Sequence, residues 1–144
     1  MIAGAQYQQL LTGEPISQAW LTPPALYEEL DREFHFDFDP CPYPFVRDAI
    51  GIEWGQSNFV NPPFRKKDGR FGHGPTAFVR KSIEEHQKGK TVVLTIPTPS
   101  YVNMLINAGA EIRSLGRVRW LDAVTKKESN QPSPITCFIL RGKA

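Results

Sequence analysis

The chain has few of the residues that mark several common classes of protein. Its 144 residues include only two cysteines, Cys41 and Cys137. They lie far apart and in no Cys-x-x-Cys or Cys/His spacing, which speaks against a zinc site or a redox pair and favours two structural thiols. No apolar run approaches the roughly 20 residues of a membrane-spanning helix, and the N-terminus lacks the basic and apolar regions of a signal peptide. We therefore expect a soluble, unsecreted protein.

An excess of charge of one sign is also missing. The 17 lysines and arginines nearly balance the 15 aspartates and glutamates, so the net charge is only +2. Bulk charge therefore does not indicate a nucleic-acid-binding protein, and local clusters have to be considered instead. Apolar residues make up 40% and charged residues 22%, which excludes a disordered chain or a coiled coil. We expect one domain over residues 1–144, with residues 1–19 as an N-terminal arm.

Proline, glycine and hydrophobic periodicity divide the first half of the chain into short elements. Leu26, Leu30 and Phe34 recur at helical spacing after a pair of prolines, which predicts a helix from Pro23 with Thr22 as its N-cap. The alternation of phenylalanine with polar residues over 34–39 predicts a strand that Pro40 ends. A brief strand is expected at 57–60.

The second half of the chain continues the alternation of helices and strands. A helix is expected over 76–88, stopped by Gly89, and another over 100–109. The continuous apolar run TVVLTIP at 91–97 is typical of a strand that is buried on both faces. Closing strands are predicted at 111–122 and 134–142, with a polar loop between them.

This order predicts an α/β fold with a mostly parallel central sheet, an antiparallel edge and helices on both faces. Sheets of this kind bind ligands at the carboxyl ends of their strands. Asp39 and the segment from Asn61 to Phe64 are expected at such ends. The candidate site is therefore placed there.

The tetrapeptide Asn61-Pro62-Pro63-Phe64 carries the most chemical information. Two prolines after a strand fix the backbone and remove two N–H donors, which leaves the Asn61 amide and nearby carbonyl oxygens as rigid acceptors. Such acceptors suit the two N–H groups of an aromatic amine, and Phe64 suits stacking on the attached ring. The structural alternative is a proline-stiffened turn with a capping asparagine and a core phenylalanine.

The order of several motifs resembles one known family. W-x-T-P before a helix, F-D-F-D-P-C-P at a strand end, W-G, S-N-F-V-N-P-P-F, T-V-V-L-T-I-P, G-R-V-R-W-L-D and P-S-P-I follow one another in this sequence. From roughly Trp20 to Leu140 the chain resembles the phage-type DNA N-6-adenine methyltransferase family. The resemblance implies a short Rossmann-like methyltransferase fold in the cytoplasm of a bacterial or phage-infected cell.

The resemblance also implies roles for particular residues. Asn61, Pro62, Pro63 and Phe64 would form the catalytic clamp on the target adenine. S-adenosylmethionine would be the cofactor, and no metal would be needed. The residues implied to hold this cofactor are Trp20, Thr22, Pro23, Asp39 and Pro40. The chain departs from the wider methyltransferase pattern in one respect, because Pro40-Cys41-Pro42 stands where a glycine-rich loop is usual.

A basic segment comes directly after the clamp. Arg65, Lys66, Lys67 and Arg70 are positioned to contact the phosphates of DNA around an extruded base, although an ordinary solvated loop has the same composition. Two other functions stay open beside the DNA adenine methyltransferase. One is a protein glutamine amide methyltransferase, since a side-chain amide offers the same planar NH2, and the other is a degenerate, non-catalytic member that binds DNA.

Overall fold

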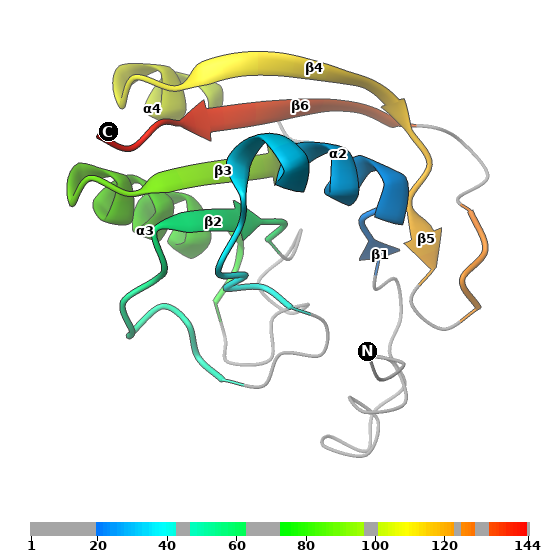
Figure 1. The fold of residues 1–144 in the computed structure, drawn as a ribbon, viewed down its shortest axis with the longest axis horizontal. Coiled ribbons are helices and arrows are strands. Elements are labelled where there is room, and N and C mark those ends of the chain that lie inside the picture. The colour runs from blue at the N-terminus through cyan, green and yellow to red at the C-terminus, as the bar shows by residue number, and fades with distance from the viewer. Residues whose placement is uncertain are drawn as a thin grey trace.

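The structure is a computed structural model that describes residues 20–42, 47–62, 73–96, 101–122, 125–128 and 133–143. The predicted N-terminal arm lies outside these residues. Four strands form the main sheet in the order β2-β3-β6-β4, and two short strands, β1 and β5, form a separate antiparallel pair (Figure 1). The strands are β1 (Trp20–Leu21), β2 (Ser57–Val60), β3 (Thr91–Ile96), β4 (Glu111–Val118), β5 (Leu121–Asp122) and β6 (Ser133–Leu140).

The directions of the strands correct the predicted sheet. β2 and β3 are parallel, but β6 is antiparallel to both of its neighbours, β3 and β4, so two of the three strand pairs are antiparallel. The expectation of a mostly parallel sheet with an antiparallel edge is therefore wrong, because the antiparallel strand is internal. The apolar composition of β6 explains its position inside the sheet, because Ile135 and the run from Cys137 to Leu140 are buried there. β4 is largely exposed and suits the edge.

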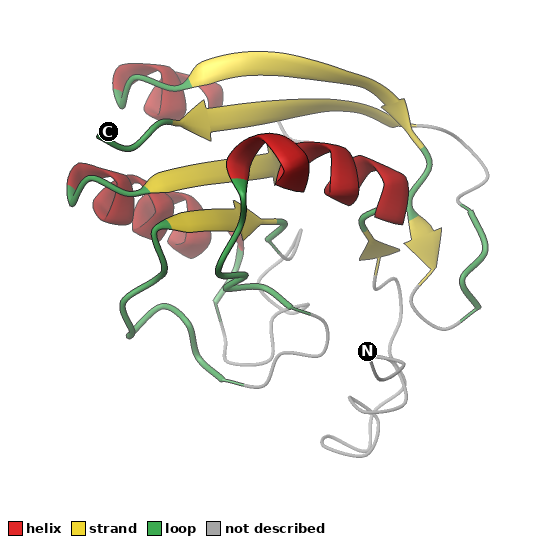
Figure 2. Ribbon diagram, viewed as in Figure 1, coloured by secondary structure: helices red, strands yellow, loops and turns green. Residues whose placement is uncertain are grey.

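Helices cover both faces of the sheet, as predicted. α2 (Pro24–Phe34) lies on one face, and α3 (Pro75–Gln87) and α4 (Val102–Asn107) lie on the other (Figure 2). The sequence anticipated α3, which ends two residues before Gly89 with its φ of 97°. None of the helices within the described residues is long and apolar enough to cross a membrane.

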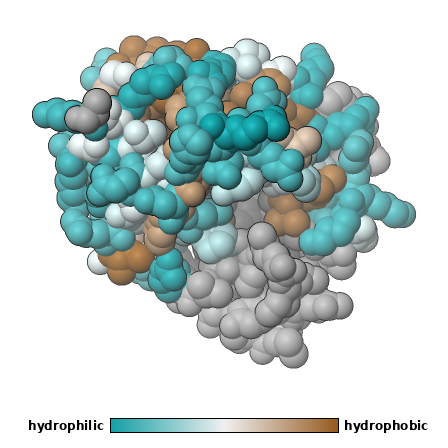
Figure 3. Space-filling model, viewed as in Figure 1, coloured by the Kyte–Doolittle hydropathy of each residue, from teal (hydrophilic) through white to brown (hydrophobic). Residues whose placement is uncertain are grey.

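The core is divided between the two faces by the alternation of side chains along β3. Val92, Leu94 and Ile96 pack into the cluster that contains residues of α3 and α4. Val93 points the other way and packs with Ile139 and with Phe34 of α2. The prediction of a strand buried on both faces is thus confirmed. On the outer surface, hydrophilic residues cover much of the viewed face and hydrophobic residues show in separate groups among them (Figure 3).

The start and end of α2 differ from the prediction. Pro23, and not Thr22, precedes the helix, and no side chain caps it. A proline in the first turn has no N–H to satisfy, which reduces the need for a cap. The helix continues through Phe34 and ends at His35, which has a left-handed φ of 51°. The strand expected over 34–39 is consequently reduced to a single parallel bridge between Phe38 and Asn58.

Candidate functional site

Asp39 and Asn61 follow two neighbouring segments of chain that run in the same direction. The bridge between Phe38 and Asn58 places the first segment beside β2, and the Phe59 amide donates a hydrogen bond to the Phe38 carbonyl oxygen at 3.1 Å. Asp39 comes directly after Phe38, and Asn61 directly after β2. The structure therefore brings both residues to the carboxyl end of the parallel β2–β3 pair, and the carboxyl ends of parallel strands are where open α/β sheets bind ligands.

The site lies on the face that α2 covers. The Phe59 ring meets the Tyr27 ring of α2 edge to face at a centroid distance of 5.1 Å. The next residue, Val60, packs into the cluster on the α3 and α4 side. Alternation along the strand then returns Asn61 to the α2 face.

Thr22 binds the Asn61 side chain. The Asn61 Nδ2 atom donates a hydrogen bond to the Thr22 Oγ1 atom at 3.3 Å. The Asn61 Oδ1 atom is buried and has no hydrogen-bond partner among the residues that the structure describes. Pro62 is buried beside it, and Pro23 beside Thr22 is half-buried. The amide is thus oriented with its acceptor unused.

Asp39 sits in a tight turn with Pro40 and Cys41. Its Oδ1 atom accepts a hydrogen bond from the Cys41 amide at 2.8 Å, which is the turn chemistry that aspartate favours. Pro40 and Cys41 are buried. Burial raises the pKa of Asp39 to about 6, against the lowering effect of that hydrogen bond. The carboxylate is poorly solvated and favours a ligand that donates hydrogen bonds or carries positive charge.

Tyr27 belongs to the same site although the sequence analysis did not single it out. Burial raises the pKa of its hydroxyl, and the negative charges of Asp31 and Asp39 raise it further. The negative charge of Asp39 therefore acts on the Tyr27 hydroxyl, which belongs to the first turn of α2. The available signal was its position three residues before Leu30, on the buried side of the helix.

Thr95 is the second residue that the sequence analysis missed. It has no exposed surface, and its Oγ1 atom has no hydrogen-bond partner within the described part of the chain. Val60 pairs with Leu94 in the parallel β2–β3 ladder, so the next step of the register sets Asn61 beside Thr95. Thr95 also shares the α2 face with Val93. The signal was a hydroxyl between Leu94 and Ile96, inside the apolar run of β3.

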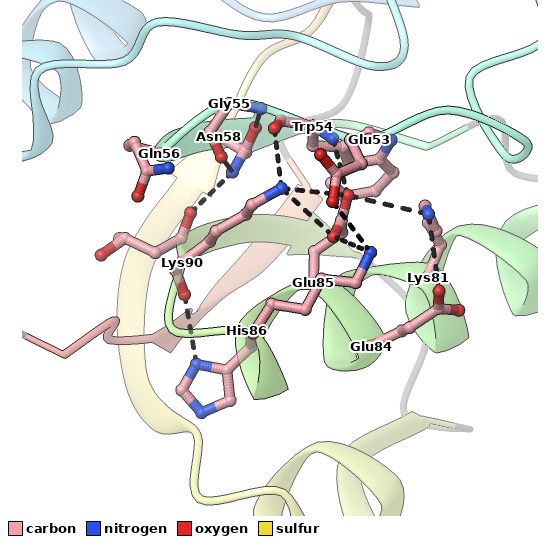
Figure 4. Close-up of polar contacts among 12 residues, drawn as sticks. Glu53, Trp54, Gly55, Gln56, Asn58, Lys81, Glu84, Glu85, His86 and Lys90 are labelled. Carbon is pink, nitrogen blue, oxygen red and sulfur yellow. Dashed lines mark hydrogen bonds and ion pairs between the residues drawn. The ribbon is translucent and has the colours of Figure 1, made fainter.

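The opposite end of the same two strands holds a polar network that is fully paired (Figure 4). Glu85 of α3 has no exposed surface, and its Oε1 atom accepts the Trp54 amide N–H at 2.6 Å. The Lys90 Nζ atom donates to the Trp54 carbonyl oxygen at 2.9 Å and lies 3.4 Å from the Glu85 carboxylate. Lys88 and Lys81 approach the same carboxylate to 3.1 and 3.7 Å.

This network fixes the chain that enters β2. Burial acts to raise the pKa of Glu85, but the Trp54 amide and the ammonium groups of Lys88, Lys81 and Lys90 outweigh it and hold that pKa below its ordinary value. Because its polar groups are satisfied within the protein, this end carries structure, while the Asn61 end keeps unused hydrogen-bonding groups.

Several predicted site residues lie outside the described residues. They are Pro63, Phe64, Arg65, Lys66, Lys67 and Arg70. The backbone of Trp20 pairs with Asp122 in the β1–β5 ladder, and its side chain is not described. No cluster of three or more histidine, cysteine, aspartate or glutamate side chains able to hold a metal occurs among the described residues.

The comparisons with known proteins add no assignment. Neither a protein-family model nor a curated protein nor a solved structure matches the chain.

Proposed function

We propose that the chain is an S-adenosylmethionine-dependent methyltransferase that acts on the exocyclic N6 amine of adenine in DNA. The observation that carries the proposal is the unused, buried Oδ1 atom of Asn61 at the end of β2. Thr22 orients this amide, and Asp39 lies at the same edge. An acceptor held in this way is what an aromatic amine requires, and an ordinary turn has no need of it.

The donors and acceptors around Asp39 fit the cofactor. A desolvated carboxylate is stabilised by the hydroxyl groups of a ribose or by an ammonium group, and S-adenosylmethionine carries both. Thr22 binds Asn61, Pro23 follows Thr22 and Pro40 follows Asp39 in the chain, and these three residues would complete the cofactor's surroundings. When bound, S-adenosylmethionine supplies a methyl group on a sulfonium, which is an excellent leaving group.

Asn61 would supply most of the chemical assistance. The lone pair of the adenine amine is delocalised into the ring, so the amine is a weak nucleophile. A hydrogen bond from the amine to the Asn61 Oδ1 atom raises the electron density on nitrogen and stabilises the positive charge that develops there. The acceptor is already oriented by Thr22, so little reorganisation accompanies the reaction.

The topology of the sheet also supports the proposal. The last strand in the chain, β6, runs antiparallel to β3 and β4 inside the sheet, and the short Rossmann-like fold that the resemblance implies is a central sheet whose last strand in the chain is antiparallel. The short turn at Asp39 replaces the glycine-rich loop with a hydrogen bond from the Cys41 amide. The contact with DNA phosphates stays a prediction for Arg65, Lys66, Lys67 and Arg70.

Transfer of a labelled methyl group tests the proposed function. The chain is incubated with labelled S-adenosylmethionine in three separate reactions. The substrate is single-stranded DNA in the first, duplex DNA in the second and a glutamine-containing peptide in the third. After digestion to nucleosides, we expect the label in N6-methyldeoxyadenosine. Label in the peptide alone would support the glutamine amide methyltransferase instead, and absence of label in all three would contradict a methyltransferase.

A further inference from the structure

We infer that Thr95 is a base-recognition residue of this site, whose hydroxyl donates a hydrogen bond to the ring nitrogen beside the target amine. The inference rests on the proposed function and names a contact beyond the clamp. Thr95 and Asn61 carry the two buried side-chain polar atoms without a hydrogen-bond partner in the described residues. The last pair of the β2–β3 register is Val60 with Leu94, and one further step sets Asn61 and Thr95 side by side on one face.

The cost of the arrangement favours a role in binding. A buried hydroxyl without a partner costs roughly 1 to 3 kcal/mol. Valine has nearly the same shape and no such cost, and Val92 and Val93 occupy other positions of this strand. A threonine at position 95 therefore lowers the stability of the ligand-free fold, and a ligand that accepts its hydrogen bond recovers the loss.

The two groups together select one arrangement of ligand atoms. The Asn61 Oδ1 atom only accepts hydrogen bonds, whereas the Thr95 hydroxyl also donates one. Adjacent strands lie about 4.8 Å apart, so the two side chains suit neighbouring positions on one ligand. Adenine offers an amine that donates and, on either side of it, a ring nitrogen that accepts. N1 and N7 both meet this description.

Matched threonine variants and adenine analogues test the contact. Thr95→Val removes the hydroxyl, and Thr95→Ser keeps it. Thr136→Val is the control, since Thr136 is half-buried on β6, adjoins Cys137 of the α2 face and therefore faces the other side of the sheet. Substrates are DNA in which adenine is replaced throughout by 1-deazaadenine or by 7-deazaadenine. Changes elsewhere in the DNA affect all variants alike and cancel in the ratio of rates.

We expect Thr95→Val to lower the methyl-transfer rate about 3- to 10-fold on ordinary DNA, while Thr95→Ser and Thr136→Val stay close to the parent. One deaza analogue should slow the parent by a similar factor and should not slow Thr95→Val further. The analogue that behaves in this way identifies the ring nitrogen, N1 or N7, to which the Thr95 hydroxyl donates. If Thr95→Val retains the parent's rate, or is slowed by both analogues as much as the parent, the contact is contradicted.

Thermal unfolding gives a readout that does not depend on activity. Removing an unpartnered hydroxyl should raise the melting temperature of ligand-free Thr95→Val by about 2 to 4 °C. A lower melting temperature would show that the hydroxyl has a partner in the folded protein and would overturn the inference. If the parent transfers no methyl group to DNA, the proposed function fails first. If the parent is active but Thr95→Val lacks the expected effects on the methyl-transfer rate and the melting temperature, only the inference about Thr95 is refuted.

Discussion

Asn61 carries two amide atoms with different tasks. Its Nδ2 atom donates to Thr22, which fixes the plane of the amide, and its Oδ1 atom stays without a partner in the described structure. The sequence placed Asn61 in the site from its two following prolines. It did not indicate that Thr22, predicted first as a helix cap and then as a cofactor ligand, meets Asn61 across 39 residues of chain.

Thr22→Val is expected to slow methyl transfer about 3- to 10-fold at saturating cofactor, because the Asn61 amide loses the hydrogen bond that orients it. Thr22→Ser should keep the parent's rate. Single-turnover rates and calorimetric titration of S-adenosylmethionine measure the two effects separately. Weaker cofactor binding with an unchanged rate would assign Thr22 to the cofactor, as the resemblance implies, and not to the orientation of Asn61.

Asp39 should make cofactor binding dependent on pH. Burial raises the pKa of its carboxyl to about 6, so the group is charged at pH 8 and largely protonated at pH 5. If the cofactor requires the carboxylate, its affinity should fall about tenfold between these values. Calorimetric titration across the range measures this, with Asp39→Asn as the control that should bind weakly at every pH.

The same carboxyl affects the ligand-free fold with the opposite sign. Its pKa is higher in the folded chain than in the unfolded chain, so the folded state holds its proton more tightly. Its contribution to stability therefore declines as pH rises from about 4 to about 6.

An affinity for S-adenosylmethionine that stays constant from pH 5 to pH 8 would remove Asp39 from the cofactor site.

At the scale of the elements, Glu85 joins α3 to the chain that enters β2. Glu85→Gln should lower the free energy of unfolding by about 3 to 5 kcal/mol, because Lys90 would stay buried without its counter-charge and Lys81 would keep the exposed Glu84 in place of the buried Glu85. Glu84→Gln is the control, since Glu84 is exposed and, within the described part of the chain, pairs with Lys81 alone at 3.6 Å. Its effect should stay within about 0.5 kcal/mol.

Urea denaturation of both variants measures this difference. The pKa of Glu85 lies below its ordinary value, so its stabilising effect is present at neutral pH and is lost as pH falls below about 4. The difference between parent and Glu85→Gln should shrink accordingly in acid. Equal destabilisation by Glu85→Gln and Glu84→Gln would show that the network contributes little.

The helices and most strands could be predicted because their patterns are local. The apolar spacing of α2 and the continuous apolar run of β3 both gave the correct element. The position of β6 inside the sheet was missed, because strand order depends on contacts between distant segments. The burial of its run from Cys137 to Leu140 is the physical reason for that position. The strand predicted at 34–39 failed because Phe34 still belongs to α2.

The candidate site was predictable in part for the same reason. Asp39 and Asn61 were recognisable because prolines mark the ends of their segments. Tyr27 and Thr95 were not, because their roles arise from α2 and β3 packing on the same face. Hydroxyl groups in apolar patterns resemble ordinary core or surface positions until the register of the sheet is known.

The whole molecule separates a paired end of the sheet from an unpaired one. At the start of β2 and β3, Glu85 and Asn58 have their polar groups satisfied within the protein. At the other end, Asn61 and Thr95 keep buried oxygen atoms without described partners. A start with paired polar groups and an end with unused hydrogen-bonding groups fit the proposed binding of a ligand at one edge of the sheet.

The central claim is that the Asn61 Oδ1 atom assists methyl transfer to adenine. The most direct measurement compares the transfer of labelled methyl from S-adenosylmethionine to adenine-containing DNA by the parent and by Asn61→Ala, with cofactor affinity measured for both. We expect the rate to fall by about 10²- to 10³-fold while cofactor affinity stays close to the parent's. Equal rates in the two proteins would contradict the claim.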